Sequence, residues 1–221
     1  MLTPREPPSM EQPMNLKEHW NHVYQTKAHD DVSWYQSRPA RSLQLIEACG
    51  VGKQEGIIDV GGGASLLVDF LLDAGFTRLA VLDISAAALA HAKERLGTRA
   101  GDVEWFEADV TGFTSPLYFN LWHDRAVYHF LTDKADRQKY VETLKRTLTP
   151  NGQIIIATFA IDGPLKCSGL KVARYDASAI VAELGEGFRL LEQVDETHTT
   201  PWGTEQKFSY FRFARIATTT P

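Results

Sequence analysis

Three acidic residues occupy positions in the chain at which a carboxylate could bind a ligand. Asp59 precedes three consecutive glycines in "IIDVGGGAS", Asp83 ends the apolar run "LAVLD", and Asp109 follows another apolar run in "FEADV". A glycine-rich turn lets bare backbone approach a ligand, because glycine adopts unusual backbone angles and has no Cβ. Carboxylates accept hydrogen bonds from ribose hydroxyls and from amines. The three segments together predict a site for an adenosine-like ligand.

The glycine loop does not fit a pyrophosphate site. A dinucleotide-binding loop has glycine at its first, third and sixth positions, but counting from Gly61 gives Gly63 and then Leu66. Asp59 lies on the strand side of the loop, where it would repel pyrophosphate and attract an amino group or a sulfonium. Asp83 can still accept both ribose hydroxyls. We therefore expect an adenosine ligand without phosphate.

The end of the third apolar run suits an adenine ring. Asp109 can accept a hydrogen bond from the exocyclic amine, and the amide of Val110 can donate one to a ring nitrogen. Each acid also has a simpler explanation, since Asp83 could cap the helix after it and Asp109 could be a solvated loop residue. Three acids at three successive strand ends favour the ligand site.

Apolar and amphipathic runs alternate from residue 56 onward. Strands are predicted at "GIIDV", "RLAVLDI", "VEWFEAD", "LYFNLWHD" and "GQIIIATF", with helices at "SLLVDFLLDAG", "AAALAHAKERLG" and "KADRQKYVETLKRTL". This rhythm is typical of a mostly parallel sheet covered by helices on both faces. A helix at 176–184 and two alternating segments around "TPWG" predict an antiparallel hairpin at the end of the domain. The sequence thus predicts a three-layer, doubly wound α/β fold.

The chain before this body divides into two parts. Residues 1–14 contain four prolines and little to bury, so we expect a disordered extension. Residues 15–54 show helical spacing after the cap Asn15 and again before Gly50, and form a predicted N-terminal helical lid. The domain itself is predicted at 55–216, followed by a tail at 217–221.

Composition restricts the partners and the compartment. The net charge of -5 argues against a broad grip on nucleic acid or on an anionic membrane. Cys49 and Cys167 lie far apart without CxxC spacing, so neither a disulfide framework nor a metal site is indicated. No apolar run reaches the roughly 18 residues that a membrane span requires. We expect a cytoplasmic protein with small or neutral partners.

Three motifs resemble those of the class I S-adenosylmethionine-dependent methyltransferases. "IIDVGGGAS" resembles the first motif of this family, "VLDIS" its acidic second-strand end, and "EADV" its adenine-contacting segment. The resemblance implies S-adenosylmethionine as cofactor and a seven-stranded sheet whose last strand is antiparallel. It implies cofactor contacts for Asp59, Gly61, Gly63, Asp83, Ile84, Asp109 and Val110. Ser65 departs from the usual loop, which has a third glycine at that position.

The N-terminal aromatic residues resemble a lid. Trp20, Tyr24 and Trp34 are spaced as in the thiol, thiopurine and halide methyltransferase branch, and as in some small protein-lysine methyltransferases. By that resemblance the three rings would close over the methionine end of the cofactor. An aromatic face attracts a sulfonium and excludes water from it. The alternative is ordinary core packing of an aromatic stripe at helical spacing.

Candidate catalytic residues follow the fourth predicted strand in "LWHDRAVYHFL". Asp124 lies just beyond the strand end, where side chains point into the site of an open α/β sheet. It could contact the reacting centre or the cofactor amino group, and His123 or His129 could act as a base. Each histidine could equally be structural.

Acceptor-binding candidates come from two further segments. The loop after the fifth strand, "FAIDGPLKCSGLKVARYD", is a candidate cover for the acceptor pocket, because such loops carry specificity. Arg174 could bind a carboxylate and Cys167 could contact a soft acceptor. The full set of candidates is Tyr35, Cys167, Arg174 and Tyr175.

The sequence therefore predicts methyl transfer to a heteroatom of a small molecule. No strong base dyad is visible, which favours a thiol, a metalloid or another soft or anionic acceptor. Strand four lacks the polar residue, prolines and aromatic residue of the enzymes that methylate nucleobase amines, so a nucleic-acid acceptor is disfavoured. A protein-lysine methyltransferase and a non-catalytic S-adenosylmethionine-binding protein stay open as alternatives. A nicotinamide oxidoreductase is disfavoured by Asp59 and Leu66.

Overall fold

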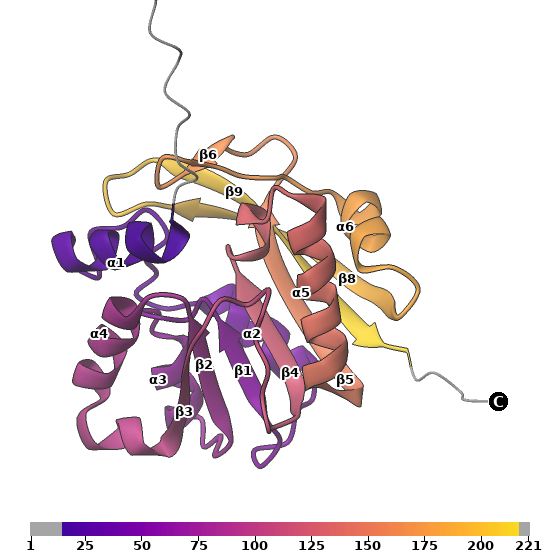
Figure 1. The fold of residues 1–221 in the computed structure, drawn as a ribbon, viewed down its shortest axis with the longest axis horizontal. Helices are drawn as coiled ribbons and strands as arrows, with labels where there is room; N and C mark the ends of the chain where they lie inside the picture. The colour runs from indigo at the N-terminus through magenta and orange to yellow at the C-terminus, as the bar shows by residue number, and fades with distance from the viewer. Residues whose placement is uncertain (1–14, 217–221) are drawn as a thin grey trace, which may run out of the picture.

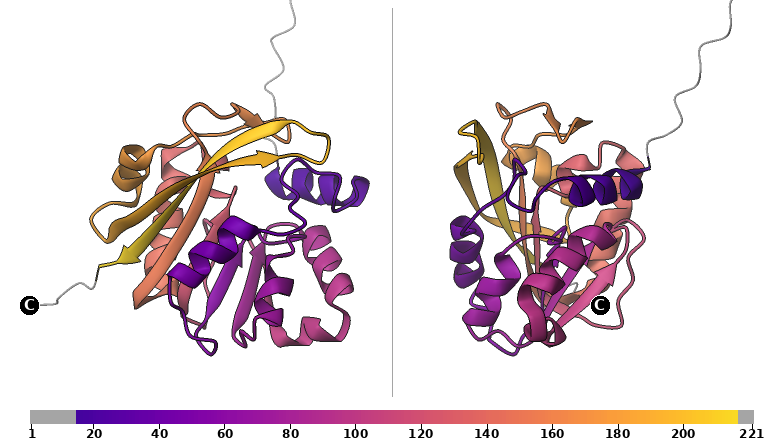
Figure 2. Two further views of the ribbon diagram at one scale, coloured as in Figure 1. Left: turned by 180° about the vertical axis from the view of Figure 1, so that it is seen from behind. Right: turned by 90° about the vertical axis from the view of Figure 1, so that its left-hand side faces the viewer.

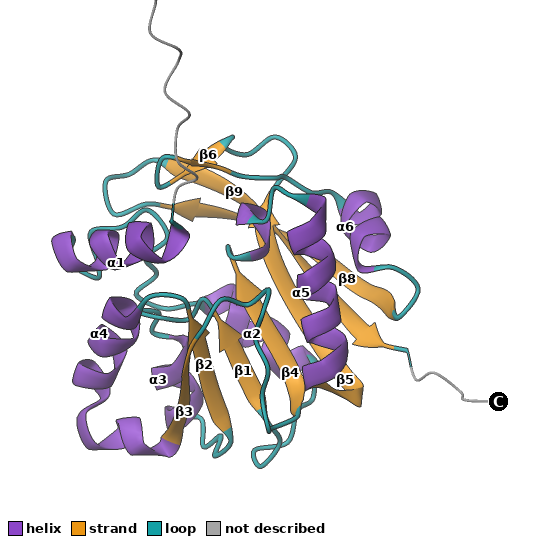
Figure 3. Cartoon of the chain, in the orientation of Figure 1, coloured by secondary structure: helices purple, strands orange, loops and turns teal. Residues whose placement is uncertain are grey.

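A single seven-stranded sheet runs through the middle of the molecule (Figures 1 and 3). The structure is a computed structural model that describes residues 15–216, so the predicted extension at 1–14 and the tail at 217–221 lie outside the described residues. The strands are β1 (Ile57–Val60), β2 (Leu79–Asp83), β3 (Val103–Glu107), β4 (Phe119–Arg125), β5 (Leu148–Phe159), β8 (Phe188–Thr199) and β9 (Glu205–Arg215). Their spatial order is β3-β2-β1-β4-β5-β9-β8. Strands β1 to β5 are parallel, whereas β9 is antiparallel to both β5 and β8.

The strand register brings the predicted acids to one edge of the sheet. Asp59 of β1 lies opposite Val81 of β2 on one side and opposite His123 of β4 on the other. Asp83 is the last residue of β2. Because the carboxyl ends of parallel strands meet at the same edge, a ligand site is built there from loops that are distant in the sequence.

Helices cover both faces of the sheet, as the two further views show (Figure 2). One core lies beneath α2 (Ala40–Ala48), α3 (Leu67–Asp73) and α4 (Ala86–Leu96). The other lies beneath α5 (Lys134–Thr147) and α6 (Ala177–Leu184). Successive residues of a buried strand serve different cores: Ile57 belongs to the first, Ile58 to the second, and both are fully buried. The predicted three-layer fold with its antiparallel hairpin is confirmed.

Helix α1 (Leu16–Thr26) lies above α4 at the carboxyl edge of the sheet (Figure 1). The Asn15 side chain caps it by accepting from the amides of Lys17 and Glu18, at 3.1 and 3.3 Å. The Asn21 side-chain oxygen accepts from the Ser85 hydroxyl at 2.9 Å, next to the end of β2. This contact ties α1 to the strand that carries Asp83.

The helical spacing predicted before Gly50 corresponds to α2, which begins at Ala40 directly after Pro39. Two details differ from the sequence-based expectation. Strand β5 begins at Leu148, four residues before the predicted "GQIIIATF". The loop after β5 contains a short hairpin, β6 (Lys166–Cys167) and β7 (Leu170–Lys171), with Ser168 at φ 50°. Two 3₁₀ segments, Gly97–Asp102 and Tyr128–Phe130, complete the described elements.

Candidate active site

A cavity of about 140 Å³ lies between α1, the carboxyl ends of the parallel strands and β9. Its walls are mostly apolar and aromatic, with a few polar groups, as is usual for a small-molecule site. The lining includes Trp20, Tyr24, Trp34, Gly61, Asp83, Ile84, Asp109, Val110, Arg125, Val127, Phe130, Leu131, Cys167, Gln206 and Phe208. Of the ten predicted cofactor residues, all but Asp59 and Gly63 are among them.

Asp83 is held at the floor of this cavity by its own loop. The carboxylate is 8% exposed, and its Oδ1 accepts from the Ser85 amide at 2.8 Å. Burial raises the pKa of Asp83 to about 7. A Cβ at Gly63 would come within 2.5 Å of Asp83 Oδ2, so the loop can approach the carboxylate this closely only with glycine there. A buried carboxylate held in this way suits the two hydroxyls of a ribose.

Gly61 begins the glycine loop with backbone that favours glycine. Its φ is +67°, and a Cβ there would come within 2.0 Å of Val127 Cγ2. The Gly61 amide donates to the carbonyl of Leu82 at 2.7 Å, which fixes the loop on β2. The turn therefore presents bare backbone to the cavity, as the triglycine predicts.

Asp109 lies at the exposed rim of the cavity. Its Oδ1 accepts from both the amide and the hydroxyl of Thr111, each at 2.8 Å. Within the described part of the chain only Oδ1 is used, so Oδ2 is available to an amine. Val110 and Ile84 line the same end of the cavity, which is the place expected for an adenine ring.

Asp59 faces a second, adjoining cavity. Its Oδ1 lies 2.7 Å from His123 Nδ1, and His123 Nε2 lies 2.9 Å from the Ser42 hydroxyl. All three side chains are buried, yet Asp59 Oδ2 has no partner among the described residues. The two cavities share Tyr24, Trp34, Val60, Gly61 and Arg125 as lining residues. An unpartnered carboxylate oxygen beside the glycine loop suits an amino group.

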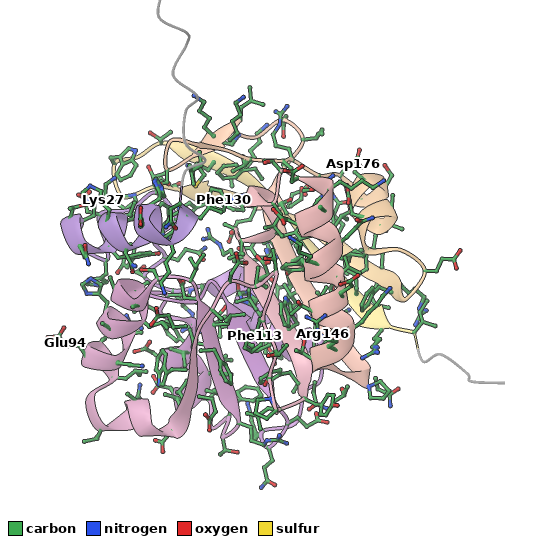
Figure 4. All side chains as sticks on the ribbon, in the orientation of Figure 1. Lys27, Glu94, Phe113, Phe130, Arg146 and Asp176 are labelled. Atoms are coloured by element: carbon green, nitrogen blue, oxygen red, sulfur yellow. The ribbon has the colours of Figure 1, made fainter. Side chains whose placement is uncertain are left out.

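The three lid aromatics form one cluster over the first cavity. Trp34 Nε1 donates to the Tyr24 hydroxyl at 3.1 Å, and the Trp20 and Trp34 ring centroids lie 5.6 Å apart. Phe130 stacks edge-on against Trp20 at 5.1 Å and lies next to α1 in Figure 4. These rings pack against one another and also line the cavity, and their closure over the methionine end of a cofactor stays a prediction.

The structure does not place Asp124 at either cavity. Its fully buried carboxylate accepts from the amides of Val127 and Tyr128, at 2.9 and 3.1 Å, and from the Tyr140 hydroxyl at 2.6 Å. Burial raises its pKa to about 6. These partners occupy the carboxylate and hold the turn after β4, where Ala126 has φ 71°. The geometry favours a structural role over the predicted contact with the reacting centre.

Replacing Tyr140 with phenylalanine tests this assignment. The change removes a charge-assisted hydrogen bond to Asp124 and leaves Trp122 Nε1, which donates to the same hydroxyl at 2.8 Å, without a partner. We expect the free energy of unfolding to fall by about 2 to 4 kcal/mol in urea titrations, with cofactor affinity changed less than about threefold. If the variant were as stable as the wild type but inactive, the result would contradict a structural role for Asp124 and favour the predicted catalytic role.

The two predicted histidines are not equivalent in position. His123 lines the second cavity and is engaged at both ring nitrogens by Asp59 and Ser42. His129 is fully buried and lines neither cavity, and its Nε2 has no partner among the described residues. Burial lowers the pKa of His129 to about 3, so its ring is neutral and weakly basic. Neither geometry supplies a base within the first cavity.

The four predicted acceptor residues lie in different parts of the structure. Cys167 is buried and lines the first cavity, where burial raises its pKa to about 11 and keeps it a thiol. Tyr35 lines the second cavity. Arg174 donates to the carbonyl of Gly163 at 3.1 Å and lines neither cavity. Tyr175 is buried in the core, 5.4 Å from the Tyr128 ring.

The unpredicted residues of the cavity wall include Arg125, Phe130, Gln206 and Phe208. Arg125 directly follows Asp124, so a prediction one residue further along β4 would have found it. Gln206 and Phe208 belong to an alternating strand, in which any polar or aromatic residue looks ordinary. Their proximity depends on β9 lying beside β5, which the local sequence does not encode.

Comparisons with known proteins agree with this geometry. A family profile described as "Methyltransferase domain" matches residues 58–154. The bovine (Bos taurus) eEF1A lysine and N-terminal methyltransferase is 25% identical over 209 residues, covering 91% of this chain. The chain spans only 28% of the length of that relative. Nodulation protein S of Sinorhizobium fredii is 26% identical over 157 residues, covering 71% of this chain and 69% of the relative.

Solved structures show the same fold. The N-methyltransferase NodS from Bradyrhizobium japonicum, in complex with S-adenosylhomocysteine, gives a TM-score of 0.67 at 17% identity and covers 88% of this chain and 97% of its own. A structure from work on the conversion of a disulfide bond into a thioacetal group during echinomycin biosynthesis gives 0.73 at 18% identity, covering 93% and 94%.

The sheet order defines a Rossmann-like methyltransferase fold. Over residues 58–154 the chain is similar to the class I S-adenosylmethionine-dependent methyltransferases, and the cofactor that this similarity indicates is S-adenosylmethionine. The two adjoining cavities together fit this cofactor on their own chemistry, since the first offers the buried Asp83 carboxylate for the ribose, the second offers the unpartnered Asp59 oxygen for the amine, and both are lined by Gly61. Within residues 15–216, no group of three or more His, Cys, Asp or Glu side chains could hold a metal ion. No helix in that range is long and apolar enough to cross a membrane.

Proposed function

We propose that this enzyme methylates a heteroatom of a small molecule bound in the first cavity. The observation that carries the proposal is the shape of that cavity. This cavity of about 140 Å³ is partly open and is walled by aromatic rings from α1 and β9, with Cys167 of the β6–β7 hairpin in its wall. A mostly apolar and aromatic wall of this kind suits a small-molecule acceptor.

The residues around the cavity would act by positioning. When bound, S-adenosylmethionine supplies a methyl group on a cationic sulfur. Asp83 would hold the ribose and Asp59 the amine, while Trp20 and Trp34 would exclude water from the sulfonium. Holding two reactants in contact can contribute roughly 7 to 11 kcal/mol to the barrier reduction. We propose residues 15–54 as the lid segment that completes this arrangement.

No histidine of the described part of the chain lines the first cavity, and this guides the choice of acceptor atom. His129 is buried outside the cavity and Cys167 stays protonated, so neither prepares a nucleophile by removing its proton. An acceptor that is already nucleophilic at neutral pH, such as a thiolate or an aromatic or weakly basic amine, needs no such help. The N-methyltransferase NodS among the similar structures favours nitrogen as the acceptor atom.

The test is a methyl-transfer assay with labelled S-adenosylmethionine and a panel of small thiols, amines, phenols, halides and metalloid anions. We expect turnover with thiols or weakly basic amines and label in the small-molecule fraction. Cofactor binding with no transfer to any member would indicate a non-catalytic binding protein and contradict the proposal.

A protein-lysine acceptor is the second candidate. It is favoured by the similarity over 91% of this chain to the eEF1A lysine and N-terminal methyltransferase. Incubating the protein with labelled cofactor and cell lysate separates the two functions, because lysine methylation would label a protein band. We further propose a cytoplasmic location, which the two free, buried cysteines favour.

A further inference from the structure

Arg125 is a cation held in the wall of the first cavity. Its Nε donates to the Tyr210 hydroxyl at 3.0 Å, and its Nη1 donates to the carbonyl of Trp34 at 3.0 Å. The guanidinium carbon lies 4.6 Å from the centre of the Phe208 ring. Nη2 is buried and has no partner among the described residues. The side chain is thus held in one orientation with one donor group unused.

The charge of Arg125 is not neutralised by a direct carboxylate partner. None of the ion pairs within residues 15–216 includes it. Glu196 reaches it only through Tyr210, whose hydroxyl donates to Glu196 Oε2 at 2.9 Å. A buried charge without a partner is costly, and such groups are normally paired. The surroundings therefore favour a negatively charged ligand at Nη2.

The neighbouring histidines are consistent with a positive local field. Burial lowers the pKa of both His129 and His198, and the charge of Arg125 lowers each further. Both rings are neutral near pH 7, so they neither compete for an anion nor supply a counter-charge. The guanidinium is the cation that this part of the cavity wall presents.

The orientation of Arg125 favours the acceptor over the cofactor. Two of its three contacts, Tyr210 and Phe208, belong to β9, while the acids suited to the nucleoside end β2 and follow β3. In the sheet order, β9 and those strands lie on opposite sides of β1 and β4. Gln206 of β9 lines the same cavity, and its Oε1 is also buried and unpartnered among the described residues. The β9 side of the cavity thus offers a cation and a neutral polar group.

We propose that the methyl acceptor carries a carboxylate that binds Arg125 Nη2. This inference rests on the proposed small-molecule function and names its substrate class: an apolar or aromatic body against the rings of the cavity, a carboxylate at Arg125, and a polar group within reach of Gln206. A protonated lysine side chain would meet a cation here, so the inference also disfavours lysine as acceptor.

The experiment compares acceptors with and without the negative charge of a carboxylate. The probes are 2-mercaptobenzoate and 2-aminobenzoate, each paired with its neutral methyl ester. Binding to the protein loaded with S-adenosylhomocysteine is measured by calorimetry, and methyl transfer is measured separately. We expect the acids to bind at least about 10-fold more tightly than the esters, since one charge-assisted hydrogen bond contributes a factor of this order.

Three variants locate the effect. Arg125→Met should lose about 10-fold or more in carboxylate binding and should no longer prefer acids over esters. Arg125→Lys keeps the charge and should retain part of the preference, which also guards against misfolding of the methionine variant. Arg174→Met is the matched control, because Arg174 contacts only a carbonyl outside both cavities and should leave all values unchanged.

The outcomes separate the two proposals. Equal binding of acids and esters by the wild-type protein, or no binding of either acid, overturns the inference. A fall in S-adenosylhomocysteine affinity in Arg125→Met, with the acid preference intact, also overturns it and assigns the guanidinium to the cofactor carboxylate. Preferential binding of acids without methyl transfer to any probe supports the carboxylate site and counts against the proposed function alone.

Discussion

Replacing Asp83 with alanine should weaken the binding of S-adenosylhomocysteine by about 100-fold or more. The carboxylate lies in the floor of the cavity and can accept both ribose hydroxyls, and each charge-assisted hydrogen bond contributes roughly 1.5 to 3 kcal/mol. Calorimetry with purified protein measures the change. Asp73→Ala is the matched control, because Asp73 is the last residue of α3 and forms an exposed ion pair with Arg99. The cofactor-product affinity of this variant should equal that of the wild type. Unchanged affinity in Asp83→Ala would contradict the ribose assignment.

The same carboxylate predicts a pH dependence. Burial raises the pKa of Asp83 from 3.8 in the unfolded chain to about 7 in the folded protein. Between these values the folded state holds a proton that the unfolded state has released, so the free energy of unfolding falls as pH rises toward 7. Above pH 7 the full cost of the buried charge is present. Cofactor affinity should change in the opposite sense and weaken as pH falls below about 7.

The conservative variant Asp83→Asn tests the predicted pH dependence of both stability and cofactor affinity. Asp83→Asn can still accept the Ser85 amide but carries no charge. Above pH 7 we expect it to be more stable than the wild type by roughly 1 kcal/mol or more, and to bind the cofactor product more weakly. Urea titrations at pH 5 and pH 8 give the stabilities. Lower stability at both pH values would mean that the charge stabilises the fold.

Gly61→Ala should reduce both stability and cofactor affinity. The substitution combines a φ of +67° with a Cβ that would come within 2.0 Å of Val127 Cγ2. We expect the free energy of unfolding to fall by about 2 to 4 kcal/mol, because backbone strain and overpacking add. The displaced loop should also lower S-adenosylhomocysteine affinity by about 10-fold or more, given that well-packed turns transmit such shifts.

Two further variants separate these causes. Gly75 has φ +83°, and a Cβ added there would meet nothing within 4 Å, so Gly75→Ala should show only the backbone cost of about 1 to 2 kcal/mol. Adding Val127→Ala to Gly61→Ala should recover part of the loss, because it removes the methyl group that blocks the new Cβ. If Gly61→Ala cost no more than Gly75→Ala, the close approach to Val127 would not matter.

The elements were predictable where local pattern and burial agree. The apolar runs ending at Asp59 and Asp83 lie in strands that are buried on both faces, so their hydrophobicity is continuous and unmistakable. The alternating segments at 188–199 and 205–215 became the hairpin strands β8 and β9. The candidate cofactor residues could be predicted for the same reason, because they directly follow the ends of these strands.

The positions of the candidate catalytic and acceptor residues could not be predicted from the local sequence pattern. Asp124 follows the rule for strand ends, yet its carboxylate turns inward to Tyr140 on α5, a contact that depends on helix packing. His123, one of two candidate bases, pairs with Asp59 on the neighbouring strand. Arg125 gains its position from Tyr210 and Trp34, which are distant in the sequence. Such roles require the tertiary arrangement, since the residue types alone permit several.

The hydrogen bond between the Ser85 hydroxyl and Asn21 joins α1 to the end of β2. Ser85 donates its amide to Asp83 and its hydroxyl to Asn21 of α1, so the residue beneath the ribose site also holds the lid. On the other side, His19 of the lid lies 3.2 Å from the Ser168 hydroxyl at the tip of the β6–β7 hairpin. Helix α1 is thus held at two points, one beside Asp83 at the end of β2 and one at the tip of the β6–β7 hairpin. In the proposed function, losing only the second contact would open the proposed lid on the side of the β6–β7 hairpin.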